Sequence, residues 1–202
     1  MRYFREQTRQ IHVGNLAIGG GAPVSVQTMA NADPHDFGQL MRQVNESAEL
    51  GCDLIRLTVP DEEAARVFGR VHDASPIPLV ADIHFNYRLA IAALKAGADG
   101  LRINPGNIGG AAHVKAVVDE ARKRRVPIRI GVNGGSLERD LMVKYGAATP
   151  EALVESAMRH VAMLEALDYR EIKISVKASD VPRTLAAYRL LSERTPYPLH
   201  LG

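Results

Sequence analysis

The sequence predicts an α/β protein of the TIM-type (β/α)8 barrel class, truncated after its seventh strand. Short apolar runs alternate with helix-like stretches along the chain, which is typical of repeated βα units. Most of these runs also alternate between apolar and polar residues. That alternation favours a barrel over an open sheet, because the central strands of an open parallel sheet are buried on both faces and are continuously apolar.

The expected elements follow from this pattern and from the signals at their ends. Seven strands are expected, at 24–29, 54–59, 78–84, 100–104, 127–132, 172–177 and 198–202. Six helices are expected between them, at 36–50, 61–73, 86–96, 111–125, 149–167 and 181–194. Thr149-Pro150-Glu151 places an N-cap residue, a first-turn proline and an acid at the start of one helix. A small hairpin is expected at 11–20, ahead of the first barrel strand.

The strand count has a consequence for the extent of the barrel. A barrel of this class needs eight strands, and only seven are found. The last segment, PLHLG at 198–202, has the pattern of a strand that leads into a loop. We therefore expect residues 1–202 to be one barrel domain, and a longer natural chain to continue past Gly202.

Composition excludes several classes of protein. The chain has 202 residues, of which 46% are hydrophobic, enough for one substantial core. The net charge of +2 does not suggest a nucleic-acid or membrane-surface protein. Cys52 is the single cysteine, so neither a disulfide framework nor a cysteine-based metal site is expected, and its place before the second strand suggests a structural role. The N-terminus lacks a signal-peptide core and no apolar run could span a membrane, so a cytoplasmic protein is expected.

Positive charge converges on the predicted mouth of the barrel, where the carboxyl ends of the strands lie. The inward-facing polar residues there are Gln27, Arg56, Asp82, His84, Arg102, Asn104, Arg129, Asn133, Lys173, Ser175, Lys177 and His200. Five of them are Arg or Lys and only Asp82 is a carboxylate. Guanidinium groups match phosphate oxygens in bidentate geometry, so a phosphate or diphosphate ligand is predicted. The alternative is that these cations form ion pairs with loop carboxylates such as Asp61, Glu138 or Asp180.

Other features allow more than one interpretation. GNIGG at 106–110 could present backbone N–H groups to a phosphate, or could be a tight turn. GGG at 19–21 lies before the first strand and is expected to be a turn. His84 and His200 could be acid–base groups or hydrogen-bonding orienters. Lys177 could be a point charge on phosphate or a Schiff-base nucleophile.

Five ordered motifs resemble one enzyme family, 4-hydroxy-3-methylbut-2-enyl diphosphate synthase of the non-mevalonate isoprenoid pathway. The motifs are PLVADIHFNYRLA (78–90), LRINPGNIG (101–109), IRIGVNGGSLE (128–138), ISVKASDV (174–181) and YPLHLG (197–202). VQTMANADPHD (26–36) resembles the first-strand motif of the family, from which Thr28, Ala30 and Ala32 depart. The resemblance covers the chain from about Arg9 to Gly202.

The resemblance implies a barrel that binds 2-C-methyl-D-erythritol 2,4-cyclodiphosphate and a separate C-terminal domain with a four-iron four-sulphur cluster. In the full-length enzyme, reduction by two electrons then gives the linear diphosphate. The family also implies a homodimer, with flavodoxin or ferredoxin as electron donor. Arg56, Arg102, Arg129 and Lys177 match its diphosphate-binding positions. Its motifs also contain Asp82, Asn104, Asn133, Ser175 and His200, as substrate contacts or orienters.

The chain departs from the family pattern in its redox half. The three cysteines and the glutamate that hold the cluster are absent, as is the glutamate that follows the HLG segment of the family. No catalytic residue is therefore assigned, no cofactor is expected on residues 1–202, and the chain alone is expected to be inactive. Two other functions remain open: a Schiff-base lyase that acts on a phosphorylated ketone through Lys177, and a ligand-binding fragment without activity.

Overall fold

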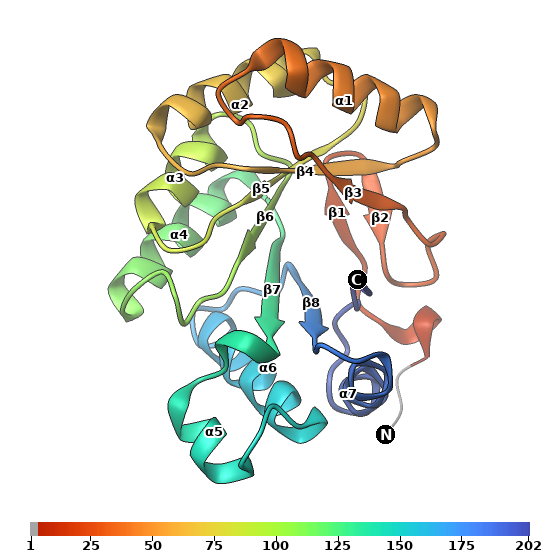
Figure 1. Cartoon of the computed structure of the whole chain (residues 1–202), viewed down its shortest axis with the longest axis vertical. Coiled ribbons are helices and arrows are strands. Elements are labelled where there is room, and N and C mark those ends of the chain that lie inside the picture. The colour runs from red at the N-terminus through yellow and green to blue at the C-terminus, as the bar shows by residue number, and fades with distance from the viewer. Residues whose placement is uncertain (1–3) are drawn as a thin grey trace.

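The computed structural model describes residues 4–202, so the first three residues of the expected 1–202 domain lie outside the described residues. A six-stranded parallel sheet curls around the centre of the molecule, with helices on its outer side (Figure 1). The strands follow one another in chain order, from β3 to β8. This arrangement is a partial (β/α) barrel, and the predicted fold class is confirmed.

The strands agree with the sequence pattern in number and place, except at the two ends of the sheet. The sheet contains β3 (Gln27–Met29), β4 (Leu54–Thr58), β5 (Leu79–Asp82), β6 (Gly100–Ile103), β7 (Ile128–Asn133) and β8 (Ile172–Lys177). The expected hairpin is present as the antiparallel pair β1 (Ile11–Val13) and β2 (Leu16–Ile18).

The six expected helices are all present, and a seventh, short one was not predicted. They are α1 (Phe37–Glu49), α2 (Glu62–Ala74), α3 (Tyr87–Lys95), α4 (Ala111–Arg124), α6 (Pro150–Glu165) and α7 (Val181–Arg194). The unpredicted helix is α5 (Arg139–Tyr145), and two short 3₁₀ turns lie at Arg5–Gln7 and Gly134–Ser136. Helix α5 buries only Leu141, so it has no apolar stripe from which it could be recognised.

The register of the strands sets charged residues side by side on the inner face. Asp82 is the register partner of Arg102, Arg102 that of Arg129, and Arg129 that of Lys173. These four residues form one row across β5, β6, β7 and β8. The residues that alternate with them, such as Ile103 in β6, point outward and are buried in the core under the helices.

The hairpin closes the opposite end of the sheet. Val13 of β1 packs with Leu54 and Val80, inward residues near the starts of β4 and β5. Gly100, at the start of β6, leaves room for this contact, since a Cβ there would lie 3.3 Å from Val13 Cγ1. The interior is therefore apolar at the hairpin end and charged toward the carboxyl ends of the strands.

The two edges of the sheet differ from the prediction. The strand expected at 24–29 is only β3, and Val24 and Val26 before it are exposed. The strand expected at 198–202 makes one parallel bridge, Ile174 to Leu199, flanked by a 2.8 Å hydrogen bond from the His200 N–H to the Ile174 carbonyl. In the described part of the chain, no ladder joins this segment to β3. Each edge segment has a strand neighbour on one side only, which explains why so little of it forms a regular strand.

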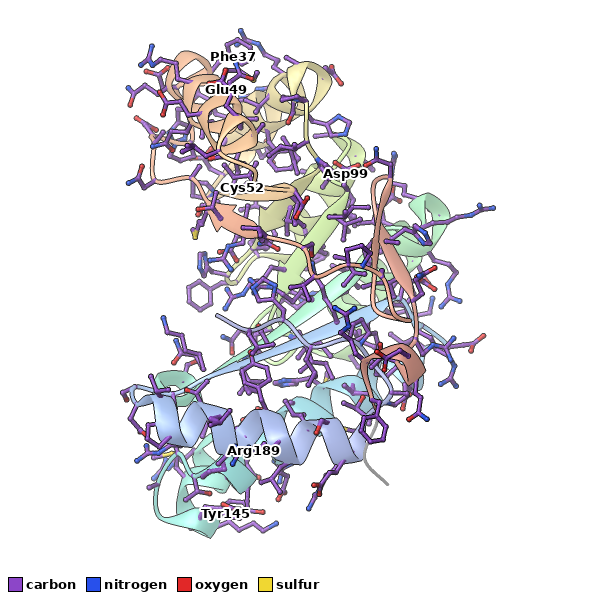
Figure 2. All side chains as sticks on the ribbon, turned by 90° about the vertical axis from the view of Figure 1, so that its right-hand side faces the viewer. Phe37, Glu49, Cys52, Asp99, Tyr145 and Arg189 are labelled. Atoms are coloured by element: carbon purple, nitrogen blue, oxygen red, sulfur yellow. The ribbon has the colours of Figure 1, made fainter. Side chains whose placement is uncertain are left out.

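The helices follow one another around the outside of the sheet, so the first and last of them lie at opposite ends of the molecule (Figure 1). Phe37 and Glu49, at the two ends of α1, lie at one end, and Tyr145 of α5 and Arg189 of α7 lie at the other (Figure 2). Cys52 lies on the α1 side, between α1 and β4, and is half-buried as a free thiol.

The hydroxyl group of Tyr188 in α7 links residues 198–202 to the sheet, and its removal tests the contribution of this link to stability. Its hydroxyl donates to the His200 carbonyl and accepts the Val176 N–H at 3.2 Å. Tyr188→Phe should lower the free energy of unfolding by about 1–3 kcal/mol, because the buried Val176 N–H loses its partner. Urea unfolding measures this loss, and amide exchange at His200 should become faster. Tyr145→Phe, which removes a hydroxyl bonded to Glu155, is the matched control. An equal loss in both variants would contradict the link.

Candidate anion-binding site

A cavity of about 420 Å³ opens at the carboxyl ends of the strands. Seven of the nine residues predicted as substrate-binding line it: Arg56, Arg102, Arg129, Asn133, Ser175, Lys177 and His200. They come from β4, β6, β7, β8 and the last segment of the chain. The curl of the sheet therefore brings together residues that are up to 144 positions apart, from 56 to 200.

Asp82 does not line the cavity but lies behind it, buried. Its Oδ1 accepts a hydrogen bond from Arg102 Nη1 at 3.0 Å. Its Oδ2 lies 3.4 Å from Arg56 Nε, an ion pair without hydrogen-bond alignment, and 3.9 Å from Nε2 of the exposed His84. Of the two roles expected for Asp82, this geometry supports that of an orienter, which holds two guanidinium groups toward the cavity.

Asn104 is also outside the lining of the cavity. It is buried, and its Oδ1 accepts the Gly106 N–H at 3.0 Å, so its side chain closes the turn that follows β6. None of the residues 106–110 lines the cavity either. For GNIGG, the geometry therefore matches a tight turn at the start of α4 and not a phosphate loop.

Most of the positive charge at this site has no counter-charge from the protein. Arg129 and Lys173 are buried, and Arg129 Nη1 has a 3.4 Å contact to Ser175 Oγ. Among residues 4–202, the site cations pair with a carboxylate only at Asp82, through Arg56 and Arg102. The Nε atoms of Arg56, Arg102 and Arg129 are buried without a hydrogen-bond partner. Buried donors without a partner and buried charges without a counter-charge both cost free energy of folding.

The loop carboxylates that could have neutralised these cations make other contacts. Asp61 Oδ2 lies 2.9 Å from His35 Nε2. Glu138 Oε1 lies 3.1 Å from His160 Nε2. Asp180 caps α7 by accepting the Arg183 N–H at 2.8 Å. The alternative in which loop ion pairs account for the arginines therefore has no support in the geometry.

Burial and mutual repulsion depress the pKa values of several basic groups here. Burial, followed by the charges of Arg129 and Arg56, lowers the pKa of Lys173 to about 7. Burial, followed by Arg129, Lys173 and Arg56, lowers the pKa of His200 to about 3, so its imidazole is neutral at pH 7. Burial also lowers the pKa of Arg129 to about 9, which still leaves its guanidinium charged at neutral pH. A bound anion would reverse each of these effects, because it favours the charged forms.

Gly131 gives the Arg102 guanidinium its place in the cavity. A Cβ at Gly131 would lie 2.8 Å from Arg102 Nε and 3.1 Å from Nη2. The side chain of Arg102 therefore crosses β7 where only a glycine leaves room. The sequence shows Gly131 on the inner face between Arg129 and Asn133, but only the fold shows what fills that space.

Gly131, Tyr188 and Lys173 are among the residues of this region that were not predicted as binding residues. Gly131 and Tyr188 line the cavity. Lys173 lies one layer deeper and lines an adjoining cavity of about 380 Å³, which shares Gln27 and His200 with the first. The signal for Lys173 was its inward position in β8, the strand that also carries Ser175 and Lys177.

A larger depression, of about 850 Å³, lies at the opposite end of the barrel, where the strands begin. Its lining mixes both signs of charge: Arg122, Arg124, Arg125 and Arg170 with Asp99, Asp168 and Glu171. Sites of TIM barrels lie at the carboxyl ends of the strands, and the charges here are balanced, so the smaller cavity is the better candidate.

The donor atoms of the described residues do not form a metal site. Within residues 4–202, no group of three or more His, Cys, Asp or Glu side chains could hold a metal ion. A four-iron cluster usually needs about four protein ligands, mostly cysteines, and Cys52 is the one cysteine of the chain. These residues therefore do not fit such a cluster. None of the helices in the described part of the chain is long and apolar enough to cross a membrane.

Comparisons with known proteins place this chain in a family. Residues 8–202 match the family described as the GcpE TIM-barrel domain. The chain is 57% identical over 198 residues to 4-hydroxy-3-methylbut-2-en-1-yl diphosphate synthase (flavodoxin) of Geobacter sulfurreducens, covering 98% of this chain and 56% of that protein. It is 54% identical to the protein of the same name from Pseudomonas syringae pv. tomato, with 98% and 54% covered. The chain thus spans about half the length of the curated relatives it matches.

Solved structures that are similar to the chain share its fold at low sequence identity. The 3-dehydroquinate dehydratase of Geobacillus kaustophilus has a TM-score of 0.69 at 17% identity, over 98% of this chain and 80% of that one. A truncated 3-deoxy-D-arabino-heptulosonate 7-phosphate synthase of Thermotoga maritima has a TM-score of 0.68 at 12% identity, over 96% and 69%. At these identities the similarity supports the barrel fold alone.

Gly131→Ala tests whether the position of Arg102 matters for anion binding. The added methyl group would displace the guanidinium, so affinity for inorganic pyrophosphate should fall about tenfold or more, as for the loss of a charge-assisted hydrogen bond. Calorimetry measures the affinity and circular dichroism checks the fold. Gly38→Ala in α1 is the control, because a Cβ there meets nothing closer than 3.4 Å. Equal affinities in both variants would show that Arg102 does not contact the anion.

Binding of an anion should also be accompanied by proton uptake at Lys173. With a pKa of about 7, this amine is mostly neutral at pH 8 in the free protein, and a bound pyrophosphate should protonate it. Calorimetry at pH 8 in two buffers of different ionisation enthalpy gives the number of protons taken up. Lys173→Met should abolish most of the uptake. A binding enthalpy that is the same in both buffers would contradict this prediction.

Proposed function

Because this chain belongs to the GcpE TIM-barrel family, we propose that it is the substrate-binding barrel of a 4-hydroxy-3-methylbut-2-enyl diphosphate synthase. Its cavity then binds 2-C-methyl-D-erythritol 2,4-cyclodiphosphate. The observation that carries this proposal is the set of cations around the cavity, of which Asp82 neutralises only part. A diphosphate supplies the missing negative charge and acceptors for the guanidinium groups that line the cavity.

The geometry supports a distinct task for each group of residues. Arg56, Arg102 and Arg129 offer guanidinium forks to phosphate oxygens, and Lys177 adds an exposed ammonium group at the rim. Asp82 sets the direction of two of these forks. Ser175, Asn133 and the neutral imidazole of His200 add polar groups that could contact the rest of the ligand, while Asn104 shapes the loop beside it.

The same cations would favour the ring-opening reaction of the full-length enzyme. Opening of the cyclic diphosphate releases a phosphate oxygen that carries negative charge. Groups that are already placed around that oxygen stabilise the charge without having to reorganise. The low exposure of Arg129 and Lys173 strengthens this electrostatic effect, because little water is present to screen it.

The reductive half of the reaction belongs to parts that residues 4–202 do not supply. We propose a four-iron four-sulphur cluster in a C-terminal domain outside this chain, since the donors described here do not fit one. For the whole protein we also propose a homodimer in the cytoplasm, with flavodoxin, which the names of the relatives include, or ferredoxin as electron donor. The role of residues 1–202 in that protein is binding and charge stabilisation.

The Schiff-base lyase alternative has no observation in its favour. Lys177 is exposed at the rim of the cavity and does not lie in an apolar pocket of the kind that activates Schiff-base lysines. Its neighbours on the inner face are the cations and polar groups of the cavity, as an anion site requires.

Arg102→Lys tests the proposed substrate directly. Lysine keeps the charge but loses the planar fork, so affinity for the cyclic diphosphate should fall by about 1–3 kcal/mol while the fold is retained. Calorimetry gives the affinity, and thermal unfolding checks the fold. Arg170→Lys, at the other end of the barrel, is the matched control and should bind as the unchanged chain does. Unchanged affinity in Arg102→Lys would make Arg102 a structural partner of Asp82.

Borohydride treatment separates the diphosphate site from the lyase alternative. The cyclic diphosphate has no carbonyl with which an amine could form a Schiff base, so no covalent adduct should form with it. None is expected with small phosphorylated ketones either, because Lys177 is proposed to bind phosphate as a charged group. Peptide mass spectrometry after reduction is the measurement. Lys177→Arg should retain part of the ligand affinity, since the charge is kept. A ketone-dependent mass increase on Lys177 would overturn the assignment.

A further inference from the structure

A buried polar cluster lies beside the cavity, where the loops after β6 and β7 meet α6. His160 of α6 is 3% exposed, and its Nε2 lies 3.1 Å from Glu138 Oε1. Ser156, one turn earlier in α6, donates its hydroxyl to the same oxygen at 3.0 Å. Glu138 is the residue before α5, and its side chain does not cap that helix. Two residues of α6 thus hold the end of the 134–138 loop.

The same imidazole also contacts the loop after β6. A Cβ at Gly106 would lie 2.8 Å from His160 Nε2 and 3.3 Å from Asn104 Oδ1. Gly106 is therefore required for close approach: the turn closed by Asn104 rests against the edge of the imidazole. His160 Nε2 touches both loops at once, through Glu138 on one side and Gly106 on the other.

Both loops lead directly to side chains of the cavity. Asn133, the last residue of β7, accepts the Gly135 N–H at 3.1 Å, so its side chain is tied to the 134–138 loop. Arg102 lies on β6, two residues before Asn104, which follows the end of the strand. A shift of either loop would therefore move a residue that lines the cavity.

We propose that His160 is a positioning residue of the anion site: it holds the loops after β6 and β7 together and thereby sets Arg102 and Asn133 around the ligand. This inference rests on the proposed function, since it concerns the same cavity. It assigns a role to a histidine that does not line the cavity. His160 Nδ1 and Glu138 Oε2 are buried without hydrogen-bond partners, which costs free energy of folding. An apolar pair would avoid that cost, so we infer that the polar contact has a role in holding the two loops.

The test compares His160→Leu with His160→Gln in binding of inorganic pyrophosphate to this chain, measured by calorimetry. Leucine removes the polar contact with Glu138 Oε1, whereas the glutamine amide nitrogen can take the place of Nε2 beside that oxygen. Affinity should fall about tenfold in His160→Leu, as for loss of a partner that orients a binding residue, and should be largely retained in His160→Gln. A purely structural role would lower the melting temperature of the leucine variant without this difference in affinity.

His72→Leu is the matched control, because His72 makes a similar contact at the other end of the barrel. A Cβ at Gly97 would lie 2.6 Å from His72 Nδ1, and His72 Nε2 is 3.6 Å from Asp99 Oδ2. The affinity of the His72→Leu variant for pyrophosphate should be unchanged. An equal loss in His72→Leu and His160→Leu would overturn the inference, as would equal affinity in the two His160 variants.

Gly106→Ala provides a second test if His160→Leu does not fold. The methyl group should push the turn away from the imidazole and weaken pyrophosphate binding, whereas Gly110→Ala, where an added Cβ meets nothing within 4 Å, should leave binding unchanged. Equal affinities in Gly106→Ala and Gly110→Ala would count against the inference. If the unchanged chain does not bind pyrophosphate, the proposed function itself fails, whereas binding that is insensitive to His160 and Gly106 refutes the positioning role alone.

Discussion

The whole structure depends on the period-two alternation of side chains along parallel strands that are paired in register. Because the sheet curls, one set of side chains is buried under helices and the other set points into the interior. The row from Asp82 through Arg102 and Arg129 to Lys173 follows directly from this constraint. A slip of one strand by one residue would move its charged residue into the outer core and place an isoleucine in the cavity.

The charged row is costly for the folded chain, and its single carboxylate offsets only part of the cost. Asp82 neutralises Arg56 and Arg102, while Arg129 and Lys173 are buried next to one another. The depressed pKa values of Lys173 and His200 reflect their burial first and this repulsion second. Both groups bind protons less readily in the folded chain than in the unfolded one. The free energy of unfolding therefore falls as the pH drops from the unfolded pKa, about 10.4 for lysine and 6.5 for histidine, to the folded pKa of about 7 for Lys173 and about 3 for His200. An anion in the cavity would turn the same repulsion into binding energy.

The two ends of the barrel have different roles, stability at one end and ligand binding at the other. At the hairpin end, Val13, Leu54 and Val80 close the interior with apolar contacts and contribute stability. At the other end, the loops after β6 and β7 carry the polar groups and are held by contacts with α6. Rigid loops matter there because hydrogen bonds from a guanidinium group to a ligand form only over a narrow range of distances. A displacement of about 1 Å would therefore weaken ligand binding.

The sequence by itself determined the fold class, the six longer helices, the inner face of each central strand and the convergence of cations, since all of these are local patterns with a fixed period. It also carried the motifs of the family. The tertiary structure alone decided the rest: β3 and 198–202 are short because they are edges, and α5 forms without an apolar stripe. Contacts between distant segments, such as Gly131 with Arg102 or Gly106 with His160, also required it, because they depend on which side chains meet across strands and loops. Asn104 shows the same limit, since its inward position in the sequence pattern gave no sign that its side chain closes a turn.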